Sequence, residues 1–168
     1  MKILVLSDSH AGLSFMRKCI QVCKPDAIVH LGDYFDDGVQ MQAENPNIPV
    51  HQVMGNCDKY RAPVSAREIL NYSICGISCY MTHGHRHYVK NSIGLLLADA
   101  RAAKAQIVMF GHTHQAVCYQ EEDGLWVLNP GACGSWGGSV GVVETDDKKI
   151  TACHLIQQAD LDSCATNG

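Results

Sequence analysis

The first ten residues, MKILVLSDSH (residues 1–10), set the pattern on which the rest of the chain is built. The apolar run over residues 3–6 has no polar alternation, which predicts a buried strand over residues 1–7. The strand runs into Asp8 and His10, and both side chains are of types that bind metal ions. In extended backbone, residues two apart project to the same side. The opening segment therefore predicts a polar site at the end of its strand.

Four further predicted strands end in the same way, with a potential ligand beside a glycine. Strands over residues 27–31, 50–54, 74–82 and 107–110 are followed by Gly32-Asp33, Gly55-Asn56-Cys57-Asp58, His83-Gly84 and Gly111-His112-Thr113-His114. Carboxylates, imidazoles and amide oxygens are ligands that suit Mn²⁺, Fe and Zn²⁺. A glycine beside a ligand lets the backbone turn sharply and approach the site. Each motif is common alone, but five of them at five strand ends predict one shared site.

The remaining pattern predicts a layered α/β domain with mixed sheets. Helices expected over residues 13–24 and 89–105 alternate with the strands, and residues 35–49 read as an acidic loop with one helical turn. From residue 116 onward, short strands over residues 117–119, 125–128, 140–144 and 150–156 are separated by turns. In such domains ligands gather beyond the carboxyl ends of strands, where the five motifs fall. We expect one domain over residues 1–156 and a polar C-terminal tail over residues 157–168.

Composition excludes several classes of partner and location. The chain has 168 residues and a net charge of −4, so it lacks the basic footprint of a protein that binds duplex nucleic acid. Its first apolar run is too short for a signal peptide or a membrane span. The nine cysteines form no CxxC pair, which favours reduced thiols in a cytoplasmic protein. A homo-oligomer is left open, with Trp136 in a glycine-rich loop as an interface candidate.

The five motifs resemble, in order and spacing, the signature of calcineurin-like metallophosphoesterases. The short chain and Asn129-Pro130-Gly131 resemble the small bacterial and archaeal phosphodiesterase branch. The resemblance covers about residues 1–156 and implies a four-layer αββα sandwich with two mixed sheets and a dinuclear site at its edge. It implies a first ion held by Asp8, His10, Asp33 and His114, and a second held by Asp33, Asn56, His83 and His112. Asp33 would bridge the two ions, because a carboxylate offers two anionic oxygens.

The same resemblance implies an activity and its cofactors. It implies two divalent ions per chain, Mn²⁺ first, with Ni²⁺, Co²⁺, Fe²⁺ and Zn²⁺ also suited to the ligand set. The expected reaction is hydrolysis of small phosphodiesters, and also of phosphomonoesters, by a hydroxide that bridges the ions. With both carboxylates and the hydroxide, the site would carry about one positive charge, which attracts phosphate. The alternative is a protein-binding scaffold with a retained metal site, like the retromer subunit of similar fold.

One position departs from the larger members of the family, which carry a histidine where this chain has Cys57. A thiol, with an ordinary pKa of about 8.5, carries no positive charge and is a weaker hydrogen-bond partner than histidine. Phosphate esters whose leaving group needs a proton are therefore expected to be hydrolysed less well. We expect Asp33, Asn56, Cys57 and Asp58 to be the catalytic group, with Asp58 orienting a neighbouring imidazole.

Other polar residues near the motifs have a structural and a functional interpretation. His30 lies inside a predicted buried strand, which favours a hydrogen-bonded core histidine. His85 and His87 follow His83 on a loop, where they either face solvent or contact substrate. Asp36 and Asp37 border the site, and we expect them to form a solvated turn.

Overall fold

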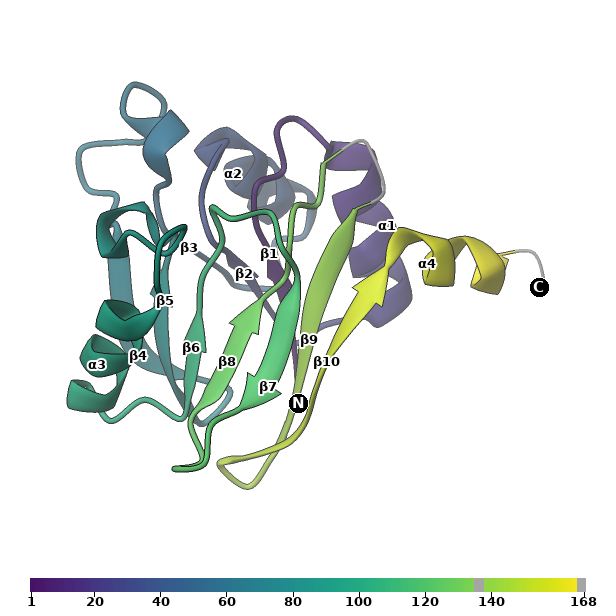
Figure 1. Cartoon of the computed structure of the whole chain (residues 1–168). Coiled ribbons are helices and arrows are strands. Elements are labelled where there is room, and N and C mark those ends of the chain that lie inside the picture. The colour runs from purple at the N-terminus through teal and green to yellow at the C-terminus, as the bar shows by residue number, and fades with distance from the viewer. Residues whose placement is uncertain (135–137, 166–168) are drawn as a thin grey trace.

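The computed structural model describes residues 1–134 and 138–165, and its strands form two mixed five-stranded sheets (Figure 1). The first sheet has the order β10-β9-β1-β2-β3 and contains β1 (Lys2–Leu6), β2 (Ala27–His30), β3 (Val50–Gln52), β9 (Ser139–Asp146) and β10 (Lys149–Gln157). The second has the order β4-β5-β6-β8-β7 and contains β4 (Ile69–Ile74), β5 (Ile77–Thr82), β6 (Ile107–Met109), β7 (Val117–Gln120) and β8 (Trp126–Asn129). The helices are α1 (Leu13–Cys23), α2 (Phe35–Glu44), α3 (Gly94–Ala102) and α4 (Gln158–Ala165).

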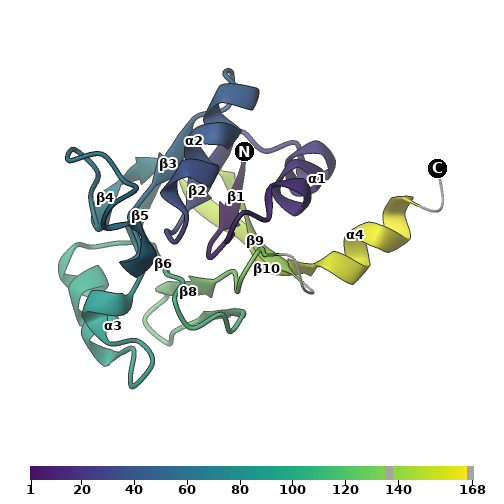
Figure 2. The ribbon, with the colours of Figure 1, turned by 90° about the horizontal axis from the view of Figure 1, so that it is seen from above.

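The sheets pack face to face between two layers of helices. Viewed from above, α1 and α2 cover the outer face of the first sheet, and α3 covers the outer face of the second (Figure 2). Three apolar clusters fill the three spaces between layers. Val5 and Met81 belong to the cluster between the sheets, Leu6 and Met16 to the cluster under α1, and Val108 and Leu96 to the cluster under α3. The four-layer αββα sandwich implied by the sequence is therefore confirmed.

Parallel pairing places the ends of the central strands side by side. In the first sheet β1 pairs with β2 in parallel, with Leu6 opposite His30. In the second sheet β5 pairs with β6 in parallel, with Met81 opposite Met109. The loops after these four strands therefore leave their sheets at neighbouring points, and these loops carry most of the polar motifs.

Three local predictions from the sequence need correction. The expected loop over residues 35–49 contains the ten-residue helix α2, whose Met41 is fully buried against α1 and β2. The strand β4, which the sequence pattern did not indicate, forms a hairpin with β5. In the predicted tail, α4 places Leu161 against the α1 cluster. Trp136, the interface candidate, lies outside the described residues.

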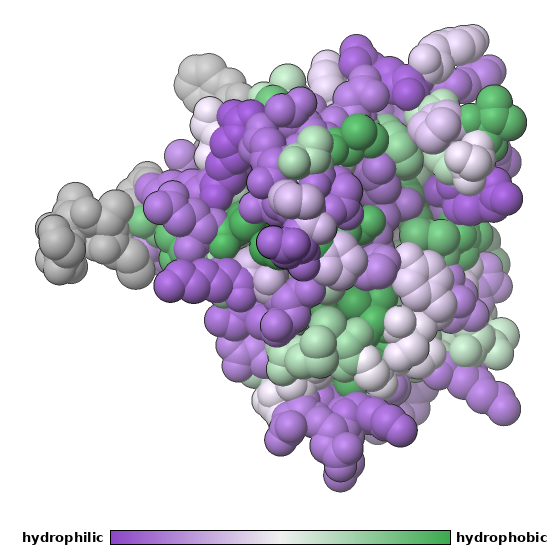
Figure 3. Space-filling model, turned by 180° about the vertical axis from the view of Figure 1, so that it is seen from behind, coloured by the Kyte–Doolittle hydropathy of each residue, from purple (hydrophilic) through white to green (hydrophobic). Residues whose placement is uncertain are grey.

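On the face seen from behind, hydrophilic residues cover most of the surface and hydrophobic ones form small groups among them (Figure 3). Among residues 1–134 and 138–165, no helix is both long and apolar enough to cross a membrane.

Candidate metal centre

The loops after β1, β2, β5 and β6 bring carboxylates and imidazoles from four distant segments into contact. Asp8 Oδ1 lies 3.1 Å from His114 Nε2 and 3.9 Å from His83 Nε2, while Asp33 Oδ1 lies 3.5 Å from His83 Nε2. Two groups have ligand atoms within 4.8 Å of one another and could each hold a cation: Asp8 with His10 and His114, and Asp8 with Asp33 and His83. Asp8 belongs to both groups, whereas the sequence assigned the shared position to Asp33. The bridging role of Asp33 stays a prediction.

The two oxygens of Asp8 have different surroundings. Oδ2 accepts hydrogen bonds from Ser7 Oγ at 2.6 Å and from the His112 backbone N–H at 3.1 Å. Oδ1 is buried, yet no donor among the described residues forms a hydrogen bond to it. A buried carboxylate oxygen without a hydrogen bond is costly, and a cation bound between this oxygen and the nearby His114 Nε2 would supply the missing interaction. The residues present therefore fit a metal ion at Asp8.

The surroundings of His83 also fit a cation. Its Nδ1 lies 2.8 Å from the Leu31 carbonyl oxygen, so Nδ1 carries the proton and donates it to that oxygen. In the neutral ring, which is the form that binds metals, Nε2 is then an acceptor, and it faces another acceptor, Asn56 Oδ1, at 3.1 Å. Two facing acceptors repel each other, whereas a cation bound to both removes the conflict.

The other candidate imidazoles complete two neighbouring pairs. The ring centroids of His83 and His112 are 5.0 Å apart, and those of His10 and His114 are 5.6 Å apart. Burial, followed by the nearby His83, lowers the pKa of His112 to about 4. His112 is therefore neutral at physiological pH, which is the form that binds metals. All seven predicted ligands lie in these neighbouring loops, and their role as ligands stays a prediction.

The backbone carries unusual conformations at this site. Five of the seven candidate ligands have positive φ, at values of 52° for Asp8, 42° for His10, 57° for Asp33, 68° for His112 and 58° for His114. Non-glycine residues in this left-handed region cost on the order of 1 kcal/mol or more each and cluster at functional sites.

Two of the glycines next to the motifs allow backbone to reach the carboxylates. A Cβ at Gly55 would collide with Asp33 Oδ1, and a Cβ at Gly111 would lie 2.7 Å from Asp8 Oδ2. The Cys57 backbone N–H donates to Asp33 Oδ1 at 2.9 Å, across the space that Gly55 leaves open. The predicted close approach is therefore confirmed at both positions.

The Asp58 carboxylate joins two of the loops at the centre. It is fully buried and accepts three backbone hydrogen bonds, from Gly55 at 2.7 Å, Phe35 at 2.8 Å and Asp33 at 2.9 Å. Among the described residues no imidazole forms a hydrogen bond to it, although its charge acts on buried His30. The expectation that Asp58 orients an imidazole stays a prediction. Asp58 ties the Asp33 loop to the Asn56 loop.

Asp36 and Asp37 were predicted to form a solvated turn, but both lie in the first turn of helix α2, and only Asp36 faces solvent. Asp36 is exposed and lies 3.8 Å from Arg61. Asp37 is only 7% exposed, and it accepts hydrogen bonds from Ser9 Oγ at 2.6 Å and from the Ala11 backbone N–H at 2.9 Å. The small polar Ser9 between Asp8 and His10 was the available sequence signal for this contact.

Two of the remaining predicted residues lie beside the centre. The Cys57 residue is exposed, yet partial burial of its sulfur together with the adjacent Asp33 raises the pKa of the thiol to about 11. The ring centroid of His85 lies 5.5 Å from that of His83 and 6.1 Å from that of His112. The Cys57 thiol is therefore protonated at neutral pH, and His85 lies within reach of a group bound at the centre.

The other two histidines belong to the interior. His87 is buried and contacts Tyr80 Oη at 3.4 Å and Asp99 Oδ2 at 3.2 Å, so it is not on a solvated loop. His30 is fully buried with Nε2 3.1 Å from Ser9 Oγ, which confirms the predicted core histidine.

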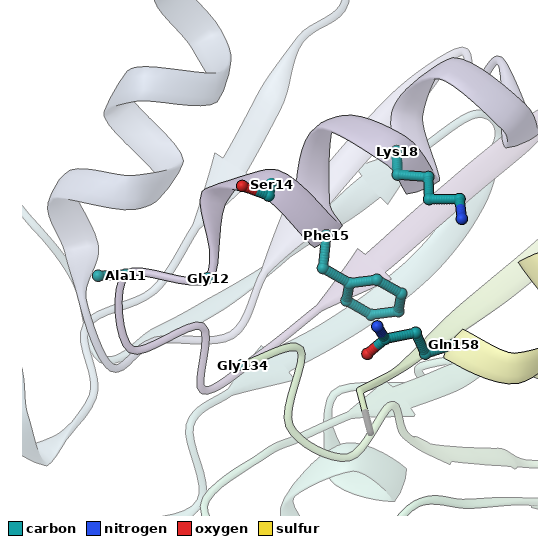
Figure 4. Close-up of a pocket in the computed structure, with 7 residues that line it drawn as sticks. All are labelled: Ala11, Gly12, Ser14, Phe15, Lys18, Gly134 and Gln158. Atoms are coloured by element: carbon teal, nitrogen blue, oxygen red, sulfur yellow. The ribbon is translucent and has the colours of Figure 1, made fainter. Parts of the chain in front are cut away.

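A separate hollow of about 410 Å³ lies beside the start of α1 (Figure 4). Its described lining includes Ala11 and Gly12, which directly follow His10, together with Phe15 and Gln158. The candidate ligands do not line it. The hollow is therefore adjacent to the centre along the chain but distinct from it.

Comparison with known proteins adds the family. The calcineurin-like phosphoesterase superfamily domain matches residues 1–148. A phosphodiesterase of Methanocaldococcus jannaschii is 28% identical over 166 residues, covering 89% of this chain and 96% of the relative. A Mycoplasma pneumoniae protein named "Probable metallophosphoesterase" is 30% identical over 157 residues, covering 92% and 88%. Zn²⁺-complexed Vps29 of Entamoeba histolytica shares the fold, with a TM-score of 0.71 at 17% identity, covering 94% of this chain and 98% of Vps29.

Proposed function

Because this chain belongs to the calcineurin-like phosphoesterase superfamily, we propose that it is a dinuclear metal-dependent phosphodiesterase, which also accepts phosphomonoesters. The observation that carries the proposal is the buried Oδ1 of Asp8, which has no hydrogen-bond donor among the described residues and lies between His114 and His83. This group supports a bound cation, which a protein-binding scaffold with a retained metal site would share, so hydrolysis separates the two functions.

The first ion is assigned to Asp8, His10, Asp33 and His114, and the second to Asp33, Asn56, His83 and His112. Two divalent ions, when bound, would lower the pKa of a water molecule towards neutrality and balance the charge of a phosphate ester. Mn²⁺ is the proposed physiological ion, because mixed oxygen and nitrogen ligands suit it.

The protein residues supply orientation around the ions. The Leu31 carbonyl fixes the ring of His83, and Ser7 together with the His112 backbone N–H fixes one oxygen of Asp8. Asp58 holds the loop that presents Asp33. A site held in this way needs little reorganisation when substrate arrives. Cys57, a thiol beside Asp33, provides no positive charge for the leaving group.

The test combines metal content with hydrolysis. After its metal has been removed with a chelator, we expect the protein to bind two Mn²⁺ ions per chain, as measured by titration calorimetry. With these ions it should regain hydrolysis of bis(p-nitrophenyl) phosphate. Asp8→Asn should abolish hydrolysis, whereas Asp36→Asn, on the exposed side of α2, should match wild type. Absence of metal binding with Mn²⁺, Ni²⁺, Co²⁺, Fe²⁺ and Zn²⁺ would refute the dinuclear site. Two bound ions without hydrolysis of aryl diesters or monoesters would favour the protein-binding scaffold.

A further inference from the structure

The side chain of Asp37 reaches from the first turn of α2 into the loop that follows β1. One of its oxygens, Oδ2, accepts two hydrogen bonds, from the Ser9 hydroxyl at 2.6 Å and from the Ala11 backbone N–H at 2.9 Å. These two residues flank His10 in the sequence. Asp37 therefore holds the chain on both sides of a candidate ligand of the first ion without touching the ligand itself.

This loop needs support from outside. His10 and Ala11 both have positive φ, at 42° and 66°, although neither is a glycine. His10 is exposed and its ring meets that of Tyr34 edge-on, with centroids 5.1 Å apart, so burial does not fix its ring as it fixes that of His83. A non-glycine residue keeps such a conformation only when its surroundings determine it. The two hydrogen bonds to Asp37 attach the backbone of this turn to α2.

A second residue extends the support into the core. Ser9 has one hydroxyl hydrogen, and the short distance to Asp37 Oδ2 assigns that hydrogen to the carboxylate. His30 Nε2, 3.1 Å from the same hydroxyl oxygen, is then the donor. The order of donation therefore runs from His30 through Ser9 to Asp37. Asp37 is 7% exposed and the other two are fully buried, so water competes little for these bonds.

We propose that Asp37 is a positioning residue, which fixes the backbone on both sides of His10 so that its imidazole reaches the first metal ion. The inference rests on the proposed function, because it presupposes the first ion. It makes no use of Asp37 as a ligand or as a proton donor. Its distinctive consequence is selectivity: loss of Asp37 weakens the ion held by His10 and spares the ion held by Asn56, His83 and His112.

The chain offers a matched control in the preceding residue. Asp36 lies in the same helical turn and carries the same charge, but its side chain is 63% exposed and faces Arg61. Removing Asp36 changes the net charge by the same amount as removing Asp37. A difference in metal affinity between the two variants therefore reports the loss of the hydrogen bonds to the loop and not the loss of a negative charge near the site.

The experiment is a two-site Mn²⁺ titration by calorimetry on metal-free wild type, Asp37→Ala, Asp37→Asn and Asp36→Ala. Partners outside the ligand shell typically change metal affinity by about 10–100-fold, and we expect a loss of that size for the first ion in Asp37→Ala. The second ion should keep wild-type affinity, and Asp36→Ala should match wild type at both sites. Asp37→Asn keeps an acceptor oxygen and nearly the same volume, so we expect it to lose less affinity at the same site.

Each outcome separates the inference from the proposed function. Wild type that binds none of Mn²⁺, Ni²⁺, Co²⁺, Fe²⁺ and Zn²⁺ refutes the proposed function and this inference with it; if another of these ions binds in place of Mn²⁺, the same titration is run with that ion. Wild type that binds two ions, with equal losses at both sites in Asp37→Ala or with no loss at all, overturns only the role of Asp37. If Asp37→Ala does not fold, Asp37→Asn decides: a selective loss at the first site supports the proposal, and wild-type affinity at that site overturns it.

Discussion

Replacing Asp58 by asparagine tests how the centre is held together. The Asp58 carboxylate uses Oδ2 for the backbone N–H groups of Gly55 and Asp33, and Oδ1 for that of Phe35. The asparagine side chain would keep the shape and one acceptor oxygen. If that oxygen takes the place of Oδ2, the amide NH₂ group faces the Phe35 N–H, and a buried donor loses its partner.

The magnitude follows from these three bonds. An unsatisfied buried donor costs about 1–3 kcal/mol. The two retained hydrogen bonds now have an uncharged acceptor, and each contributes about 0.5–1 kcal/mol less to stability. The expected loss in the free energy of unfolding is therefore about 2–5 kcal/mol, a large part of the roughly 5–15 kcal/mol available to a domain. Because the three bonds join Asp58 to backbone N–H groups, the loss should appear without any ion.

Urea unfolding of chelated protein measures this loss as a lower midpoint at an unchanged slope. Asp36→Asn is the control, and as a surface change it should stay within about 0.5 kcal/mol of wild type. A loss for Asp58→Asn below about 1 kcal/mol, or one equal to the control, would show that Asp58 does not tie the two loops together.

Two further predictions concern the ions and the leaving group. Asp33→Ala should release both ions, because Asp33 is the proposed bridge, whereas His114→Ala should keep the second; retention of both ions by Asp33→Ala in titration calorimetry contradicts the bridge. Cys57→His should speed hydrolysis of alkyl phosphodiesters more than aryl ones, because an alkoxide needs an acid, which typically contributes about 10²–10⁴-fold. The comparison requires that the variant keep both ions, and an unchanged dependence on the leaving group would show that Cys57 does not set substrate preference.

The fold was largely readable from local patterns. Buried strands such as residues 1–7 appear in the sequence as apolar runs, and each run ends where a polar motif begins. Helix α2 was not readable in this way, since its apolar residues are few and Gly38 lowers its helix propensity. Burial of Met41 against α1 and β2, a tertiary contact, stabilises it. The edge strand β4 was missed for a similar reason, because pairing with β5 defines it.

The sequence by itself determined the members of the centre, because ligand type and strand-end position are both local properties. It did not determine what holds those members in place. Asp37 looked like its neighbour Asp36, yet the direction of α2 turns one towards Ser9 and the other towards Arg61. Asp58 looked like a partner for an imidazole, yet the folded loops aim three backbone N–H groups at it. A hydrogen bond depends on distance and direction between groups far apart in the chain, and only the tertiary structure decides these.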